Sequence, residues 1–309
     1  VTTHPIDLPV ADSDSAFANF DAITYGKGAS LLKQLAYLLG EEPFRNGITN
    51  YLNSNSGQNT TLDDLVSSLS AAAGRDLNDW TQQWFYTKGP NTIAVDYQCE
   101  DGTIAAISLT QSAPDDAPTL REHHLALGLY TGNELTTQVR VSLTGVTTRV
   151  DTLLDEPCPD FVFPNQGEWA YAKVRLAEKD YAQLAVKLHS FDDPLDRAML
   201  WRALWEGVRD LRMPITDYSE ILLANIAQEI NPSLLLGIFN NLDAVISYYY
   251  SFGDEYAEQR KAFIQRYEAI AWRQVRESDA GSDLQKSWFD NLVYNTQSET
   301  GLNHLAELL

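Results

Sequence analysis

The sequence lacks the motifs from which most metal and nucleophilic sites are built. None of its five histidines belongs to an H-E-x-x-H motif, in which two histidines one helical turn apart hold a zinc ion: His4, His123, His124, His189 and His304. His123 and His124 are adjacent on an expected strand, where successive side chains point to opposite faces. The chain also has no G-x-S-x-G motif, no Cys–His signature and no G-x-x-x-x-G-K-[ST] phosphate loop. We therefore predict no metal site within this chain.

Cysteine is scarce as well, since the chain contains only Cys99 and Cys158. Two cysteines make no disulfide framework, and at this separation they make no C-x-x-C metal pair. A reducing compartment is the simpler interpretation, and a single bridge between the two stays open. Residues 1–5 lack a basic region followed by an apolar core, so they do not form a signal peptide. We expect a cytoplasmic protein. The sequence starts without Met, as expected of a piece of a longer protein, so a signal peptide further upstream stays open.

Basic residues are outnumbered, with 22 Lys and Arg against 43 Asp and Glu, for a net charge of -21. This charge repels phosphate backbones and disfavours nucleic-acid binding. It could attract a cationic group, such as the free amino end of a peptide, although a solvated acidic surface is the commoner meaning. No apolar run approaches the ~20 residues of a membrane-spanning helix, so we expect no membrane insertion.

The first part of the chain, residues 1–89, has the spacing of short helices. After Tyr25, leucines recur on one helical face until Gly40: Leu31, Leu32, Leu35, Leu38 and Leu39. Thr61 and Asp64 have the spacing of an N-cap, before a second apolar face. Asp76 is expected to cap a further helix that carries Trp80 and Trp84.

The middle part, residues 90–175, changes to the period of two that is typical of strands. Ile93, Val95 and Tyr97 alternate with polar or small residues, and Asp101-Gly102 is a strong hairpin signal. Short strands at this spacing predict a β-sandwich.

The last part, residues 176–309, returns to helical spacing. Asp193-Pro194 and Asn231-Pro232 each place a capping residue before a proline at the first helical position. Ser282 and Gln285 have capping-box spacing. Antiparallel helices joined by short loops, stacked as hairpins, are the architecture that this pattern predicts.

Tyr25 is the one candidate catalytic side chain. It lies at the start of a helix, in the segment FDAITYGKGASLL of residues 20–32. Close to a metal site, a phenol can donate a hydrogen bond to the oxyanion that forms as a carbonyl becomes tetrahedral. From the residues alone, a tyrosine at a helix start is more often structural, with a packed ring and a solvated hydroxyl.

This segment resembles the aminopeptidase N family of zinc metallopeptidases, and most of all its actinobacterial branch. The likeness is carried by His4-Pro5-Ile6, by FDAITYGKGA at residues 20–29 and by LLKQL at residues 31–35. Further likeness to the family follows in the same order along the chain, at residues 59–65, 74–77, 80–84, 89–92, 163–165, 171–176 and 201–205.

The resemblance implies a four-domain enzyme that removes N-terminal amino acids from peptides. In the family one zinc is held by two His and a Glu, a second Glu is the general base, and a G-x-M-E-N segment binds the free amino group. None of these motifs occurs in this chain, so we expect them in an upstream catalytic domain of the same polypeptide. Only the family's catalytic tyrosine carries over, onto Tyr25. Its implied role is to stabilise the gem-diolate that forms when water attacks the scissile carbonyl.

The expected fold is a multidomain α+β protein. Residues 1–89 would be the C-terminal helical portion of a thermolysin-like catalytic domain, residues 90–175 a β-sandwich, and residues 176–309 an all-α superhelical array of helix hairpins that is truncated. The expected function is that of a C-terminal fragment of a zinc aminopeptidase, inactive by itself, with zinc and peptide substrates bound only by the full-length enzyme. The alternative is a non-enzymatic scaffold that uses the β-sandwich and the helical array to bind peptides or proteins.

Overall fold

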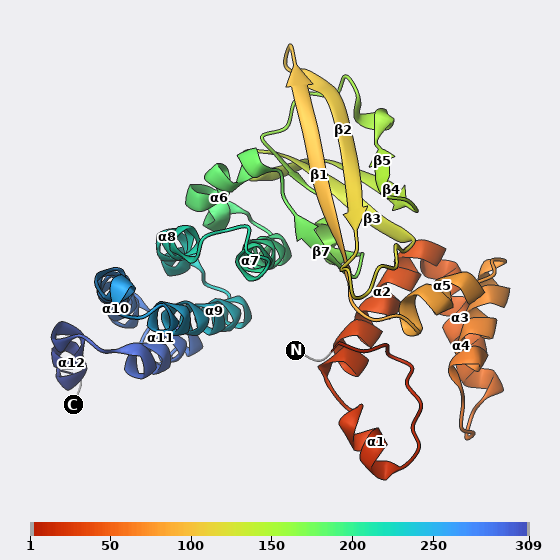
Figure 1. Ribbon diagram of the computed structural model, residues 1–309, viewed down its shortest axis with the longest axis horizontal. Coiled ribbons are helices and arrows are strands. Elements are labelled where there is room, and N and C mark those ends of the chain that lie inside the picture. Colours follow the sequence, from red (N-terminus) through yellow and green to blue (C-terminus); the bar gives the residue numbers. More distant parts are fainter. Residues whose placement is uncertain (1–2, 308–309) are drawn as a thin grey trace. The chain divides into compact units, whose positions relative to one another are not determined.

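The computed structural model describes residues 3–307 and separates into two compact units, which divide between Ala177 and Glu178. The structure is mixed α+β, with two small sheets and a helical C-terminal region (Figure 1).

The first unit begins with helices that pack around one apolar cluster. They are α1 (Ser13–Ala18), a π-helical turn (Ile23–Lys27), α2 (Gly28–Leu39), α3 (Glu41–Ser54), α4 (Leu62–Ala73) and α5 (Asn78–Phe85). The cluster contains Leu31 and Leu35 of α2, Leu69 of α4, and Trp80 and Trp84 of α5. The expected leucine stripe is correct except at Leu32, which is 39% exposed.

The helix ends follow the capping residues closely. Gly40 ends α2 with φ of +88°, a conformation that glycine adopts without a steric penalty. Thr61 and Asp64 form the expected capping box at the start of α4. Asp76 accepts a hydrogen bond from the backbone N–H of Asn78 at 2.9 Å, but Leu77 is the N-cap residue of α5, so the expectation that Asp76 is the cap is off by one position.

Seven strands form two sheets in the rest of this unit: β1 (Asn91–Glu100), β2 (Thr103–Ser112), β3 (His123–Thr131), β4 (Glu134–Leu143), β5 (Thr147–Arg149), β6 (Phe161–Phe163) and β7 (Ala172–Arg175). One sheet has the order β5-β2-β1-β7 and the other β4-β3-β6. All pairings are antiparallel except β1 with β7. The hairpin between β1 and β2 turns at Asp101 and Gly102, where both residues have positive φ, so the Asp-Gly prediction is confirmed.

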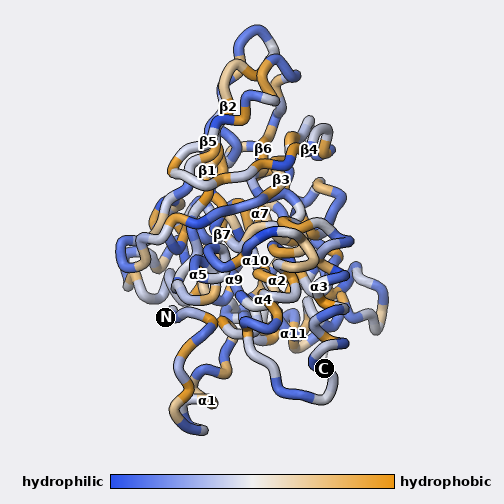
Figure 2. Tube along the Cα trace, turned by 90° about the vertical axis from the view of Figure 1, so that its right-hand side faces the viewer, coloured by the Kyte–Doolittle hydropathy of each residue, from blue (hydrophilic) through white to orange (hydrophobic). Residues whose placement is uncertain are grey.

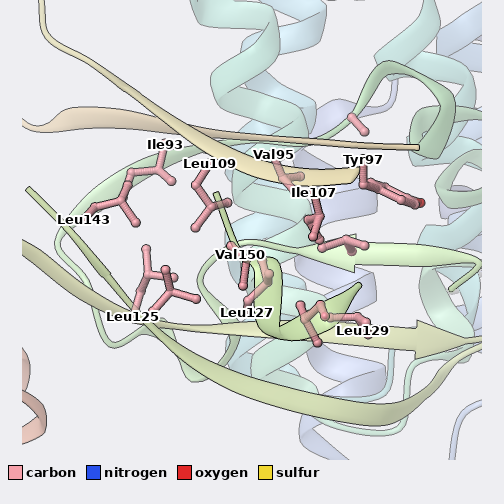
Figure 3. Packing of buried hydrophobic residues seen from close by; sticks show 14 of the residues in the cluster. Ile93, Val95, Tyr97, Ile107, Leu109, Leu125, Leu127, Leu129, Leu143 and Val150 are labelled. Atoms are coloured by element: carbon pink, nitrogen blue, oxygen red, sulfur yellow. The ribbon is translucent and has the colours of Figure 1, made fainter. Parts of the chain in front are cut away.

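The two sheets share one apolar core (Figure 3). Alternate residues of β1 and β2, among them Ile93, Val95 and Leu109, face Leu125 and Leu127 of the other sheet. This arrangement follows from the period of two in the sequence, because alternate side chains of a strand lie on the same face. The result is a sandwich of two packed sheets.

Cys99 on β1 and Cys158 before β6 form a disulfide that closes a loop of 59 residues. The sequence left this bridge open and favoured a reducing compartment. The structure shows the bridge, because pairing of the strands brings two distant cysteines to a Cα–Cα separation of 5.8 Å.

The second unit is helical: α6 (Tyr181–Lys187), α7 (Pro194–Arg209), α8 (Ile215–Asn225), α9 (Pro232–Ser251), α10 (Ala257–Glu277), α11 (Asp283–Asn295) and α12 (Glu299–Ala306). Asp193, Asn231 and Ser282 accept hydrogen bonds from backbone N–H groups at the starts of α7, α9 and α11, as predicted. A buried ion pair between Arg197 and Glu229, with Nε and Oε2 2.8 Å apart, ties α7 to the segment before α9.

Hydrophilic and hydrophobic residues are interspersed along the whole trace (Figure 2). Between residues 3 and 307, no helix combines the length and the apolar character that crossing a bilayer requires.

Candidate active-site segment around Tyr25

Tyr25 lies in a π-helical turn, Ile23–Lys27, that leads directly into α2. The prediction that Tyr25 lies at a helix start is therefore correct. The π-helical form of the turn was not predicted, because helix propensities do not distinguish a π-helix from an α-helix. Single π turns are rare and occur mostly as local bulges, often at functional sites.

The side chain of Tyr25 is held by few contacts. It is 61% exposed, and its ring meets the edge of Phe20 with the ring centroids 5.2 Å apart. Within residues 3–307, its hydroxyl has no hydrogen-bond partner. An outward-facing phenol without a partner is free to donate to a group that binds against this face.

The two glycines that flank this turn leave open space beside it. A Cβ built on Gly26 or on Gly28 would meet no described atom within 4 Å, and neither residue has positive φ. Neither packing nor backbone conformation in the described chain therefore explains why glycine stands at these two positions. A second surface that approaches the turn closely would explain it.

The Asp21 side chain holds the start of the turn, next to the N-cap residue Ala22. Its Oδ1 accepts hydrogen bonds from the backbone N–H groups of Ile23 at 2.9 Å and Thr24 at 3.1 Å. The Thr24 hydroxyl in turn donates to the carbonyl oxygen of Asn19 at 2.8 Å. These bonds satisfy backbone donors at a helix start that would otherwise lack partners.

Lys27 ends the turn and is buried, at 3% exposure. Its Nζ donates to the carbonyl oxygen of Thr87 at 2.8 Å, and it lies 6.0 Å from the ring centre of Tyr171. Burial, together with the smaller effect of the positive charge of Arg121, lowers the pKa of Lys27 to about 8. Lys27 thereby joins the turn to the residues that follow α5.

Arg121 is a second buried cation in this region, at 1% exposure. Its guanidinium donates to the carbonyl oxygens of Gln83 and Lys88, both at 2.8 Å, to the Asn91 side chain at 3.0 Å and to the Thr87 hydroxyl at 2.6 Å. Burial lowers the pKa of Arg121 to about 10. The network fixes the residues that lead from α5 into β1, including the acceptor of Lys27.

Further contacts hold α2 against the sandwich within the first unit. The rings of Tyr37 and Trp169 stack with centroids 4.6 Å apart, and the Arg140 guanidinium lies 4.4 Å from the Tyr37 ring centre. Lys33 donates from Nζ to the carbonyl oxygen of Gly167 at 2.8 Å. The helix that begins next to Tyr25 is therefore anchored along its length.

The described residues offer no ligand set for zinc. Across residues 3–307, no three His, Cys, Asp or Glu side chains are grouped so that they could hold a metal ion. Both ring nitrogens of His4 face oxygen acceptors. His123 is fully buried against Trp84, with its pKa lowered to about 3 chiefly by burial, whereas His124 contacts Glu122 and Ser142. These two histidines contact different groups, as expected of neighbours on a strand.

Comparison with known proteins places this segment in a family. Residues 1–84 match the family model described as "Peptidase family M1 domain", and residues 161–309 match that of the "ERAP1-like C-terminal domain". Aminopeptidase N of Streptomyces lividans is 33% identical over the whole of this chain. The chain belongs to the aminopeptidase N family, peptidase family M1.

The chain is also similar to other aminopeptidases. A probable aminopeptidase 1 of Saccharolobus solfataricus is 44% identical over 94 residues, which are 30% of this chain and 12% of that protein. The fold is similar to that of aminopeptidase A of Legionella pneumophila, solved with aspartic acid, with a TM-score of 0.62, 16% identity and 94% of this chain covered. The chain spans 37% of the length of the Streptomyces protein and 37% of the Legionella chain.

The sequence indicates Tyr25 as the candidate catalytic residue of this M1 segment, but it does not indicate the groups that hold the turn in place. The sequence makes no prediction for Lys27 or Arg121, since nothing in their sequence neighbourhood indicates burial. Asp21 and His4 stood within quoted family motifs, but their contact spans 17 residues and is set by the tertiary structure.

Proposed function

We propose that this chain is the C-terminal part of a zinc-dependent aminopeptidase that removes N-terminal amino acids from peptides. Every comparison reported above is to an aminopeptidase or to a domain of that family. The binding-scaffold alternative is not favoured, because the matched family models and relatives named above are those of aminopeptidases. The zinc ligands, the general base and the peptide's amino-binding segment would belong to an upstream catalytic domain of the same polypeptide.

Tyr25 is the residue of this chain that we propose to touch the reacting atoms. Its exposed, unpartnered hydroxyl on a π-helical turn is the observation that carries the proposal. As the scissile carbonyl becomes tetrahedral, negative charge develops on its oxygen. A phenol held in place would donate a hydrogen bond to that oxygen more strongly than to the uncharged carbonyl, and would therefore stabilise the transition state more than the substrate.

The other parts of the chain have proposed roles that follow the family. Residues 1–89 would complete a thermolysin-like catalytic domain, residues 90–175 would be the sandwich domain, and residues 176–309 would form part of a superhelical array that limits the access of peptides. The zinc chemistry would be supplied by residues outside this chain.

The cytoplasmic location stays a prediction, and the Cys99–Cys158 disulfide weighs against it. Disulfides form and persist in oxidising compartments and are rare where glutathione and thioredoxin keep thiols reduced. An oxidising site of action is therefore the alternative to be tested.

The decisive experiment replaces Tyr25 by Phe in the full-length, zinc-loaded protein. We expect kcat for an aminoacyl anilide to fall by about a hundredfold or more, with little change in KM, because the lost hydrogen bond is strongest in the transition state. The purified chain 1–309 should show no zinc-dependent cleavage of the same substrate. Unchanged kcat in Tyr25→Phe would overturn the role of the tyrosine, and activity of the isolated chain would overturn the assignment of the zinc site to an upstream domain.

A further inference from the structure

A single carboxylate links His4 to the turn that carries Tyr25. Oδ2 of Asp21 lies 2.9 Å from Nε2 of His4, while Oδ1 of the same group accepts the backbone N–H groups of Ile23 and Thr24. One side chain therefore contacts both His4 and the start of the Tyr25 turn. The segment of His4 is itself anchored, because the backbone N–H groups of the two residues after Pro5 donate to the carbonyl oxygen of Phe85 at 3.0 and 3.2 Å.

The geometry around His4 requires the charged imidazolium. Nδ1 faces the carbonyl oxygen of Pro5 at 2.6 Å, and Nε2 faces the Asp21 carboxylate. Both oxygens can only accept, so both ring nitrogens must carry a hydrogen for the two bonds to form together. The contact is an ion pair with side chains that are 18% and 33% exposed.

The pKa values of the two groups agree with this geometry. Hydrogen bonds to the Pro5 carbonyl and to Asp21 raise the pKa of His4, against the opposing effects of burial and of the Lys27 charge. The hydrogen bond from His4 lowers the pKa of Asp21. The nearest other acid on the His4 segment, Asp7, is hydrogen-bonded to Tyr86 and raises the pKa of that phenol. Asp21 and Lys27 are thus the charged groups that act on His4.

We infer that His4 and Asp21 are positioning residues for Tyr25, and that their ion pair sets the direction in which its hydroxyl projects. This inference rests on the proposed function. The Tyr25 ring is mostly exposed and contacts Phe20, so packing constrains it weakly and its direction depends on the backbone turn. That turn is held at one end by the His4–Asp21 pair and at the other by Lys27 on Thr87.

Turnover is therefore expected to fall as the pH rises through the pKa of His4. Below the raised pKa of His4 the imidazolium holds both oxygens and the turn is fixed. As the pH rises through that pKa, the ring loses one N–H and its charge, and the pair weakens. The contribution to kcat is therefore present at low pH and lost at high pH, while substrate affinity, which does not depend on this pair, stays nearly constant.

The test measures kcat and KM of the full-length, zinc-loaded enzyme between pH 5.5 and 9 for wild type and His4→Gln. At pH 6 we expect kcat of His4→Gln to be lower by about two- to fivefold, the range that a partly exposed ion pair supports, with KM little changed. The ratio of the two kcat values should approach one by pH 9. His124→Gln is the matched control, because His124 also pairs with a carboxylate, Glu122 at 2.6 Å, but on strand β3. Its kcat ratio to wild type should not change with pH.

Two further variants separate the possible failures. In a Tyr25→Phe background, His4→Gln should cause no additional loss of kcat, since the pair acts only through the hydroxyl. Asp21→Asn keeps an oxygen for the turn but removes the charge, and should reproduce the pH-dependent loss even if His4→Gln does not fold. If Tyr25→Phe leaves kcat unchanged, the proposed function itself fails. The role of the ion pair is refuted separately if Tyr25→Phe strongly lowers kcat but His4→Gln and Asp21→Asn have wild-type kcat. It is also refuted if the two variants lower kcat by the same factor at every pH, or if they lower kcat as much in the Tyr25→Phe background as in wild type.

Discussion

The Lys27 ammonium donates to the carbonyl oxygen of Thr87 at 2.8 Å from a buried position. The bond spans 60 residues and joins the turn of Tyr25 to the end of the helical part of the first unit. The acceptor is itself held, because the Thr87 hydroxyl receives a hydrogen bond from Arg121. The burial of two cations that repel each other, Lys27 and Arg121, lowers the stability of the folded state. The arrangement nevertheless fixes the position of the turn relative to the segment after α5.

The depressed pKa of Lys27 predicts how stability varies with pH. In the unfolded chain Lys27 has an ordinary lysine pKa, whereas in the folded protein it is about 8. Between these values the unfolded state binds more protons, so stability rises with pH there, by no more than about 1.4 kcal/mol per pH unit. Urea unfolding of wild type and Lys27→Met at pH 7, 8, 9 and 10 should show the wild type gaining relative to the variant above pH 8. Parallel pH profiles for the two proteins would contradict this prediction.

The glycines of the first unit predict opposite effects of the same substitution. A Cβ on Gly26 meets no described atom within 4 Å, so Gly26→Ala should stabilise the turn by about 0.5–1 kcal/mol through the higher helix propensity of alanine. A Cβ on Gly47 would lie 2.7 Å from Cδ2 and 3.0 Å from Cα of Leu69, so Gly47→Ala should destabilise by about 1–3 kcal/mol. Thermal unfolding should show a higher Tm than wild type for Gly26→Ala and a lower Tm for Gly47→Ala.

Activity adds a second readout for Gly26. If a second surface approaches the Tyr25 turn, as the glycines suggest, Gly26→Ala should lower kcat/KM of the full-length enzyme despite its higher stability. A variant that is both more stable and fully active would show that the open space beside Tyr25 is simply solvent.

The Cys99–Cys158 bridge predicts a redox-dependent stability. Closing a loop of 59 residues restricts the unfolded chain, and its loss should cost about 2–4 kcal/mol. Denaturant unfolding with and without a thiol reductant should show this difference for wild type and none for Cys99→Ala/Cys158→Ala. Alkylation of protein isolated from its native cells, without prior reduction, should modify neither Cys99 nor Cys158. Two alkylated cysteines would instead support the reducing cytoplasm expected from the sequence.

Local signals predicted much of the architecture because they act through neighbouring residues. Thr61 and Asp64 cap α4, Asn231 caps α9, and Asp101-Gly102 turns the β1–β2 hairpin, each through contacts that span two or three positions. Local spacing also explains why Leu32 was wrongly expected to be buried. Its helical spacing marks it as apolar and near the buried face, but only the packing of α2 decides which edge of that face stays exposed.

The groups around Tyr25 could not be predicted in this way. Arg121 donates to residues that are 30 to 38 positions away, and His4 contacts Asp21 across 17. A charged residue carries no mark of its burial in the sequence, because burial depends on which other segments fold over it. The π-helical form of the turn also escapes propensity arguments, which describe helices in general.

The sequence by itself determined the order of helices and strands, the position of Tyr25 at a helix start and the likeness to zinc aminopeptidases, because these depend on local spacing and on contiguous motifs. Only the tertiary structure decided that Cys99 joins Cys158, that Lys27 is buried on Thr87 and that His4 pairs with Asp21. These contacts arise when distant segments are brought together by the burial of the two apolar cores of the first unit, and no local pattern records which partners then meet.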